Sequence, residues 1–184
     1  MSMRRYLSRM KGGGSSQKRH SVQWLLWSLI GGFLGISAVA YLNQLFALAE
    51  SDKLFLIGSF GASAVLVYGT PHVLYAQPRN LVGGHLISAL VGVTVSRYIE
   101  LPVELQAACA VAFSILLMHL TITLHPPGGA SALIAVLGSE QVQQMGYLFV
   151  LQPVLTGVTI MLVVALLVNN LSSDHQRHYP KNWW

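Results

Sequence analysis

Between residues 54 and 169 the sequence carries only five charged side chains, namely Arg79, Arg97, Glu100, Glu104 and Glu140. Over the whole chain, 9% of the residues are charged and 53% are hydrophobic, and the mean hydropathy is +0.56. A soluble domain carries about 25% charged residues. Because a charged side chain is costly in hydrocarbon, this composition predicts an integral membrane protein that has the lipid bilayer as its partner.

The apolar stretches differ in length. Crossing about 30 Å of hydrocarbon takes about 20 helical residues, and four stretches reach that length, at 24–48, 81–99, 103–123 and 148–168. Two others, at 54–69 and 126–138, are short, rich in Gly, Ala and Ser, and preceded or followed by proline. The pattern predicts an all-α membrane protein with four long transmembrane helices plus two short helices that are broken or re-entrant.

The two short stretches resemble each other. Gly61-Ala62-Ser63-Ala64 reappears as Gly129-Ala130-Ser131-Ala132, and the sequence at 92–95 is echoed at 157–160 with nearly the same offset. We interpret this as one transmembrane domain, 23–169, built from two long-short-long repeats at about 24–99 and 103–168. Re-entrant short segments would give four spans and parallel repeats. Crossing segments would give six spans and inverted repeats, which is the arrangement we favour.

Basic side chains gather before the first span. Residues 1–20 contain six of them and no acid, around a Gly/Ser run at 12–16 that is typical of a flexible segment. The positive-inside rule places this tail, 1–22, in the cytoplasm, which we take to be that of a bacterium. Both topologies return the polar, mobile-looking tail at 170–184 to the same side. Since the first tail accounts for the net charge of +5, the charge does not indicate a nucleic-acid partner.

The stretch from Leu124 to Ala132 interrupts the apolar region with a histidine, two prolines and two glycines. Backbone at membrane depth has to be paired by protein or lie in a water-filled cavity, and transporters often place broken helices where a polar solute binds. Proline is favoured in the first turn of a helix. Pro126 and Pro127 therefore predict a helix start just after His125.

The first turn of such a helix has N–H groups without an intrahelical partner. Together with the helix dipole, these groups form an anion site that needs no basic side chain. The alternative is a structural kink sealed by neighbouring helices, and Gly-Ala-Ser runs are also common packing surfaces. The predicted anion ligands are His125, Gly128, Gly129, Ala130 and Ser131, with Ser59, Gly61 and Ser63 in the equivalent turn of the other repeat.

Arg79 is the only basic residue between Lys53 and Arg97. At a pore mouth it would attract an anion, although an arginine that meets lipid headgroups would give the same pattern. Asn80 follows it and could cap a helix that begins near Leu81.

Small residues recur four apart at Gly84, Ser88, Gly92 and Ser96. On a helix this spacing forms one stripe, along which a second helix can approach closely. We therefore predict a tight helix–helix contact along this stripe.

Four histidines, His72, His85, His119 and His125, are the remaining polar points of the apolar region. Neutral histidine can exchange a proton near physiological pH, so the residues leave proton coupling open. The sequence contains no zinc-protease motif, nucleotide-binding loop, nucleophile elbow or pair of catalytic carboxylates. We therefore expect no enzyme activity, no cofactor and no metal site.

Three blocks, at 57–64, 77–85 and 123–130, resemble in order the HPP family of integral membrane proteins. The family is named after the His-Pro-Pro motif, which stands here at 125–127, and the resemblance extends over about 24–168. It implies a functional role for Arg79 and Asn80. It also implies four spans, and so opposes the six-span arrangement. Family members in photosynthetic organisms are linked to nitrite transport, whereas most bacterial members are uncharacterised.

Taken together, the residues and the resemblance predict a permease or channel for a small monovalent anion, with nitrite as the best candidate. The anion would bind at the half-helix N-termini, Arg79 would draw it in, and Asn80 would position the loop. The alternative is a membrane scaffold or sensory subunit that transports nothing. A chain this small also leads us to expect a homo-oligomer.

Overall fold

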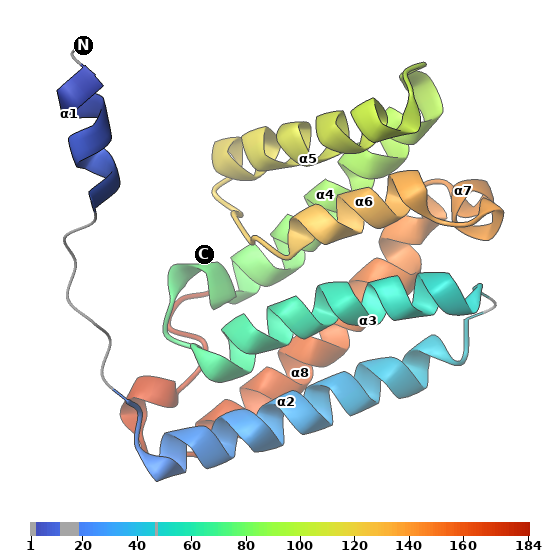
Figure 1. Cartoon of the computed structure of the whole chain (residues 1–184). Helices are drawn as coiled ribbons and strands as arrows, with labels where there is room; N and C mark the ends of the chain where they lie inside the picture. The colour runs from blue at the N-terminus through green and yellow to red at the C-terminus, as the bar shows by residue number, and fades with distance from the viewer. Residues whose placement is uncertain (1–2, 12–18, 47) are drawn as a thin grey trace.

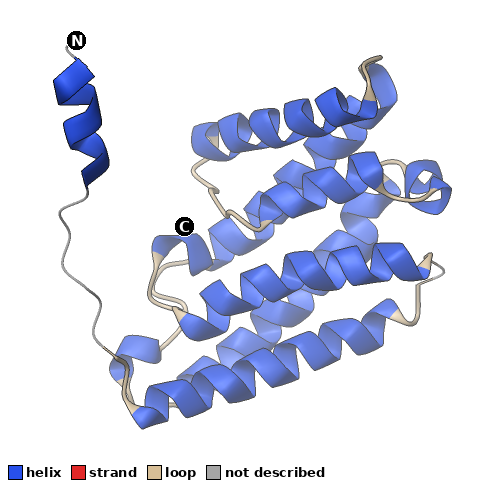
Figure 2. Cartoon of the chain, viewed as in Figure 1, coloured by secondary structure: helices blue, strands red, loops and turns tan. Residues whose placement is uncertain are grey.

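The computed structural model describes residues 3–11, 19–46 and 48–184, and the regular elements within these ranges are all helices (Figure 2). The predicted all-α class is thus confirmed. The Gly/Ser run at 12–16 lies outside the described residues. The helices are α1 (Met3–Ser8), α2 (Val22–Asn43), α3 (Glu50–Ala64), α4 (Pro78–Tyr98), α5 (Val103–Leu120), α6 (Gly128–Leu137), α7 (Glu140–Met145) and α8 (Thr156–Asn170).

Short turns extend or connect these helices. A π-helical turn, Val65–Gly69, continues α3, and we call it the α3 extension. Another π-helical turn, Val150–Leu155, precedes α8. Single 3-10 turns lie at Arg9–Lys11, Leu74–Ala76 and His175–Arg177.

Local sequence explains where several helices begin. The Ser21 hydroxyl accepts a hydrogen bond from the Trp24 N–H (3.2 Å) and so caps α2. Pro78 occupies the first position of α4, where its missing N–H is not needed. The predicted N-cap role of Asn80 is wrong, because Gln77 is the N-cap residue of α4 and Asn80 lies inside the first turn.

Five helical segments of the described chain are long and apolar enough to cross a membrane, and α6, with 10 residues, is the short one. The predicted division into four long and two short helices is not confirmed, because the stretch expected at 54–69 is part of a 20-residue helix, Glu50–Gly69. The charged side chains of its first turn have partners: Lys53 pairs with Glu50 (2.9 Å), and the buried Asp52 accepts from the Ser139 N–H (3.0 Å).

Hydrogen bonds at the two ends of the bundle define the direction of each segment. At one end, Arg177 of the C-terminal tail bonds to Trp24 at the start of α2 and to Tyr68 at the end of the α3 extension. At the opposite end, Asp52 at the start of α3 bonds to Ser139, which follows α6. The described chain therefore passes along the bundle six times, in alternating directions (Figure 1).

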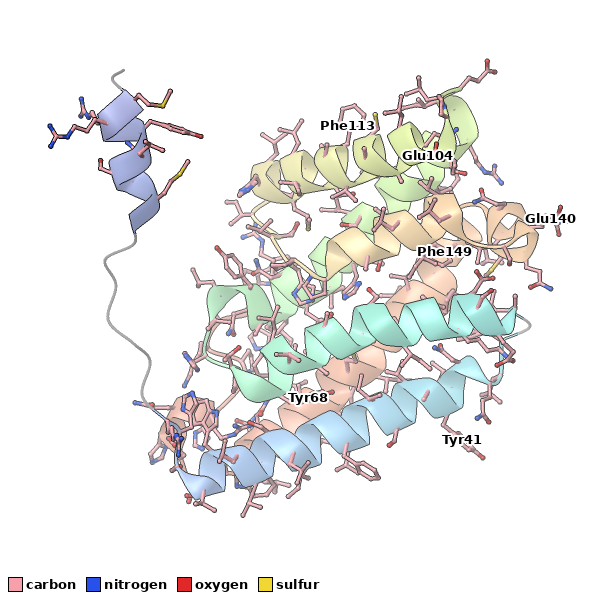
Figure 3. The ribbon with its side chains drawn as sticks, in the orientation of Figure 1. Tyr41, Tyr68, Glu104, Phe113, Glu140 and Phe149 are labelled. Carbon is pink, nitrogen blue, oxygen red and sulfur yellow. The ribbon has the colours of Figure 1, made fainter. Side chains whose placement is uncertain are left out.

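The helices form two layers. In Figure 1, α5, α6, α3 and α2 form a front layer, with α4 and α8 behind them. The outer helix α2 packs against α8, and α5 packs against α4, so each outer helix contacts a rear helix from the other half of the chain. In Figure 3, Tyr68 and Phe149 are buried inside the bundle, whereas Tyr41 and Phe113 lie on its outside, where an apolar surface suits lipid.

The predicted packing stripe is the contact between α4 and α6. A Cβ atom built on Gly92 would lie 2.5 Å from the Ala132 carbonyl oxygen and 2.8 Å from its Cα atom. Only glycine allows the two backbones to approach this closely.

Replacing Gly92 by alanine is expected to lower the free energy of unfolding by about 1–3 kcal/mol, because the new methyl group meets backbone that cannot move aside. Thermal unfolding in detergent measures the loss. Gly32→Ala on α2 is the matched control, since its Cβ atom would meet nothing within 4 Å. A melting temperature for Gly92→Ala equal to that of Gly32→Ala would contradict the tight contact.

The C-terminal tail, which we predicted to be mobile, packs into the bundle. Arg177 is completely buried, and its guanidinium lies 4.8 Å from the centre of the Trp24 ring. Burial lowers the pKa of Arg177. The Tyr179 hydroxyl donates to the Ala76 carbonyl (2.7 Å), and the Lys181 N–H donates to Gln77 Oε1 (2.8 Å). These contacts close the bundle end where α2 and α4 begin.

Candidate functional site

Five polar side chains meet inside the bundle and form what we call the Ser–His network. Ser59 and Ser63 come from α3, His85 from α4, His125 from the loop before α6, and Ser131 from α6. None of them is more than 2% exposed. The network therefore joins three helices at a point shielded from both water and lipid.

Ser63 is the centre of the network. Its Oγ lies 2.7 Å from His85 Nε2 and 2.8 Å from His125 Nε2. The other ring nitrogens are also bonded: His85 Nδ1 lies 2.8 Å from Ser131 Oγ, and His125 Nδ1 lies 2.7 Å from the Tyr75 carbonyl oxygen.

These partners fix the direction of every hydrogen bond when both rings are neutral. A carbonyl oxygen only accepts, so His125 Nδ1 carries a hydrogen and its Nε2 accepts from the Ser63 hydroxyl. Ser63 Oγ then accepts from His85 Nε2–H, and His85 Nδ1 accepts from the Ser131 hydroxyl. The two imidazoles therefore hold opposite tautomers.

Close packing holds the rings in place. The His85 and His125 ring centres are 5.0 Å apart, and the Phe60 ring lies 5.5 Å from His85. Gly84 lets the His125 loop reach α4, because a Cβ atom there would lie 2.9 Å from the Thr123 carbonyl oxygen and would collide with the His125 side chain.

A cavity of about 390 Å³ lies beside the network at the bundle end closed by the C-terminal tail. We call it the vestibule. Tyr75, Arg79, Asn80 and His119 are among its lining residues, and Trp184 of the tail forms part of its wall. Tyr75 connects it to the network, since its carbonyl binds His125.

The two predicted residues of the vestibule are held by the loop that follows α5. Arg79 Nη2 donates to the Thr121 carbonyl (2.7 Å), and Asn80 Nδ2 donates to the Leu124 carbonyl (2.8 Å). Asn80 thus fixes the backbone immediately before His125.

A second cavity, the α3–α6 cleft, approaches the network from the other side. Its volume is about 310 Å³. It reaches Ser59, whose hydroxyl lies 3.4 Å from that of Ser131 and 3.2 Å from the Pro127 carbonyl. The network therefore separates the vestibule from the cleft. The cleft is lined by Gly58, Ser59, Ala130, Leu133, Ile134, Leu137 and Gly138.

The structure brings together four of the predicted site residues, Ser59, Ser63, His125 and Ser131. Gly61 is outside this group, because a Cβ atom on it would meet nothing within 4 Å. The prediction of two facing helix starts is wrong for the first of them, since Ser59 and Ser63 lie well inside α3.

The prediction of unpaired N–H groups at the start of α6 is also wrong. The N–H groups of Gly128, Gly129 and Ala130 donate to the carbonyls of the three residues His125, Pro126 and Pro127, at 2.9, 3.2 and 3.1 Å. The tight turn through the two prolines brings these carbonyls within reach. An anion site in this conformation therefore has to use side chains.

Sequence reasoning missed two contributors to the network, His85 and the Tyr75 carbonyl, and one buried group elsewhere in the bundle, the Asp52 carboxylate. His85 was noted only as a polar point, although it adjoins Gly84 on the packing stripe and so could have been placed facing α6. The Tyr75 carbonyl and the buried Asp52 carboxylate give no sequence signal, because their partners are more than 40 residues away.

Comparison with known proteins identifies related sequences. Residues 17–180 match the family described as HPP, transmembrane region. A transmembrane protein of Dictyostelium discoideum is 42% identical over 182 residues, which is 97% of this chain and 57% of that protein. A second one from the same organism is 45% identical over 161 residues, covering 86% of this chain and 55% of that protein. The chain thus spans just over half the length of these relatives. No solved structure matches it.

Proposed function

We propose, from the premise that this chain belongs to the HPP family of transmembrane proteins, that it transports a small monovalent anion, with nitrite as the best candidate. One observation carries the proposal: a buried polar network lies between two cavities that approach it from opposite sides. Polar and ionisable groups inside a membrane protein are costly and mark substrate or proton pathways.

The charge of the vestibule favours an anion. Among the described residues that line the vestibule, Arg79 is the one with a permanent charge, and none of the described residues that line either cavity is acidic. A positive charge at a pore mouth raises the local concentration of anions and repels cations. The choice of nitrite rests on the resemblance to family members linked to nitrite transport.

Movement of the anion requires a second conformation. The network fills the space between the vestibule and the cleft, so α3 and α6 have to separate at Ser59 and Ser131 for an anion to pass. The 3.4 Å contact between these two hydroxyls is the longest of the side-chain contacts that join different elements of the network, and we expect the network to open there.

The closed network also supports a second candidate function. All its imidazole nitrogens and hydroxyl groups have partners within the protein. A non-transporting membrane scaffold or sensory subunit would show the same closure, with the network serving to join three helices. Flux through the purified protein distinguishes the two functions.

Replacing Arg79 by glutamine is expected to lower nitrite flux into proteoliposomes by about tenfold, which corresponds to about 1.4 kcal/mol. The cause is the loss of the charge that attracts the anion into the vestibule. Lys181→Gln is the matched control, because it removes a positive charge from the same end without lining the cavity. Nitrate, formate and chloride measured in parallel define the selectivity. Equal fluxes for the two variants would remove Arg79 from the pathway.

A further inference from the structure

The Ser–His network is a continuous line of hydrogen bonds with a single direction. In the neutral state the Ser131 hydroxyl donates to His85 Nδ1, His85 Nε2–H donates to Ser63 Oγ, and the Ser63 hydroxyl donates to His125 Nε2. Each of these three links is 2.7 or 2.8 Å long. The line starts beside the α3–α6 cleft, which Ser59 connects to Ser131, and ends beside the vestibule.

The geometry points to a proton relay: the line carries a proton from the side of the cleft to His125, and the charge so formed draws one anion from the vestibule. This inference rests on the proposed function, and it specifies that the anion is taken up together with a proton.

The transfer balances at every step. A proton arrives at Ser131 Oγ, and the original Ser131 hydrogen passes to His85 Nδ1. The hydrogen on His85 Nε2 passes to Ser63 Oγ, and the original Ser63 hydrogen passes to His125 Nε2. One proton has been added, His125 has become an imidazolium, and no bond between heavy atoms has changed.

The transfer leaves a specific trace on His85. Before the transfer His85 carries its hydrogen on Nε2, and afterwards it carries it on Nδ1. His125 then donates from both nitrogens, to the Tyr75 carbonyl and to Ser63 Oγ, which in turn donates back to His85 Nε2. A network that serves only to hold helices together is expected to keep the same His85 tautomer and the same hydrogen-bond directions.

The partners of the two rings in the described chain are all uncharged before the proton is transferred. The described groups that contact the two rings are Phe60 and Ser63 from α3, Ser131 from α6 and the Tyr75 carbonyl. No carboxylate in the described chain bonds to either ring. An anion attracted into the vestibule by Arg79 would supply the negative charge. This links protonation of His125 to anion uptake with one proton per anion.

Nitrogen-15 NMR of protein labelled at its histidines tests the relay without measuring transport. His85→Gln and His125→Gln variants assign the two rings among the seven histidines. On acidification, His125 is expected to become an imidazolium while His85 changes from the Nε2–H to the Nδ1–H tautomer. A wild-type His85 that keeps one tautomer throughout the titration would overturn the relay.

Ser63→Ala interrupts the line at its centre and is expected to abolish the tautomer change of His85. Ser114→Ala is the matched control, because Ser114 is equally buried but donates only to the Ala110 carbonyl of its own helix (2.7 Å). A His85 tautomer change that persists in Ser63→Ala would overturn the relay. The wild-type titration decides the question even if Ser63→Ala does not fold.

Proteoliposomes that contain a pH-sensitive dye complete the test. A nitrite gradient is expected to drive proton uptake through the wild-type protein and through Ser114→Ala, and Ser63→Ala is expected to lose it. Nitrite flux without proton uptake would overturn the relay and leave the proposed function intact. A different result would be a protein that carries none of nitrite, nitrate, formate and chloride but still shows the tautomer change of His85. That result would overturn the proposed function and the coupling to anion uptake, and it would leave the transfer of the proton to His125 intact.

Discussion

Replacing Arg177 by alanine is expected to lower the free energy of unfolding by about 3 kcal/mol or more, because four hydrogen bonds inside the protein are lost together. The guanidinium donates to the carbonyls of Trp24 (3.1 Å) and Tyr68 (2.8 Å), to Ser28 Oγ (2.9 Å) and to Asn169 Oδ1 (2.9 Å). For a chain of this length the loss corresponds to a fall in melting temperature of about 6–12 °C. Thermal unfolding in detergent measures it.

The Arg177 substitution is also expected to release the tail at 171–184, which limited proteolysis detects. Lys181→Ala is the control, because the Lys181 side chain is exposed and donates only to the His175 carbonyl (2.9 Å). Arg177→Lys should fall between the two, since lysine keeps the charge but lacks the planar fork of donors. A tail in Arg177→Ala as resistant to protease as that of the wild type would contradict the anchoring role of this residue.

Replacing Asp52 by alanine is expected to cost about 2–3 kcal/mol of unfolding free energy at the other end of the bundle. The buried carboxylate accepts from the Ser139 N–H (3.0 Å) and from the Ser139 hydroxyl. Because Ser139 is the N-cap residue of α7, Asp52 ties the start of α3 to the junction between α6 and α7. Thermal unfolding in detergent again gives the loss.

Two further variants sharpen the Asp52 measurement. Asp52→Asn should retain most of the stability, since the amide can accept from the Ser139 N–H and donate to its hydroxyl. Glu50→Ala, in the same turn of α3, removes only an exposed ion pair with Lys53, which contributes little. Equal melting temperatures for Asp52→Ala and Glu50→Ala would show that the buried carboxylate does not tie the two elements.

Local sequence signals predicted the elements that depend on local chemistry. The scarcity of charge predicted the membrane class, and Pro126 and Pro127 predicted a helix start that the structure places two residues later, at Gly128, with Pro127 as the N-cap. The recurrence of Gly-Ala-Ser led to Ser63 and Ser131, which the structure brings into one network with His125. These signals come from backbone geometry and from the cost of polar groups in hydrocarbon, both of which act over a few residues.

The remaining features depend on partners far away in the chain. The predicted stretch at 54–69 is shorter than the helix because the first turn of α3 is charged, yet the Asp52 carboxylate is held by hydrogen bonds from the N–H and hydroxyl of Ser139. The tail was expected to be mobile because it is polar, yet Arg177 finds oxygen acceptors on α2, α8 and the α3 extension. No pattern within a single segment reports such contacts.

The way the outer helices are partnered has a consequence for biosynthesis. Among the described helices long enough to span a membrane, α2 comes first along the chain and α8, against which it packs, comes last. Because α2 also packs against α3, only the face of α2 that contacts α8 lacks its partner until α8 has been inserted. The bundle is therefore closed only once α8 has been made and packs against α2.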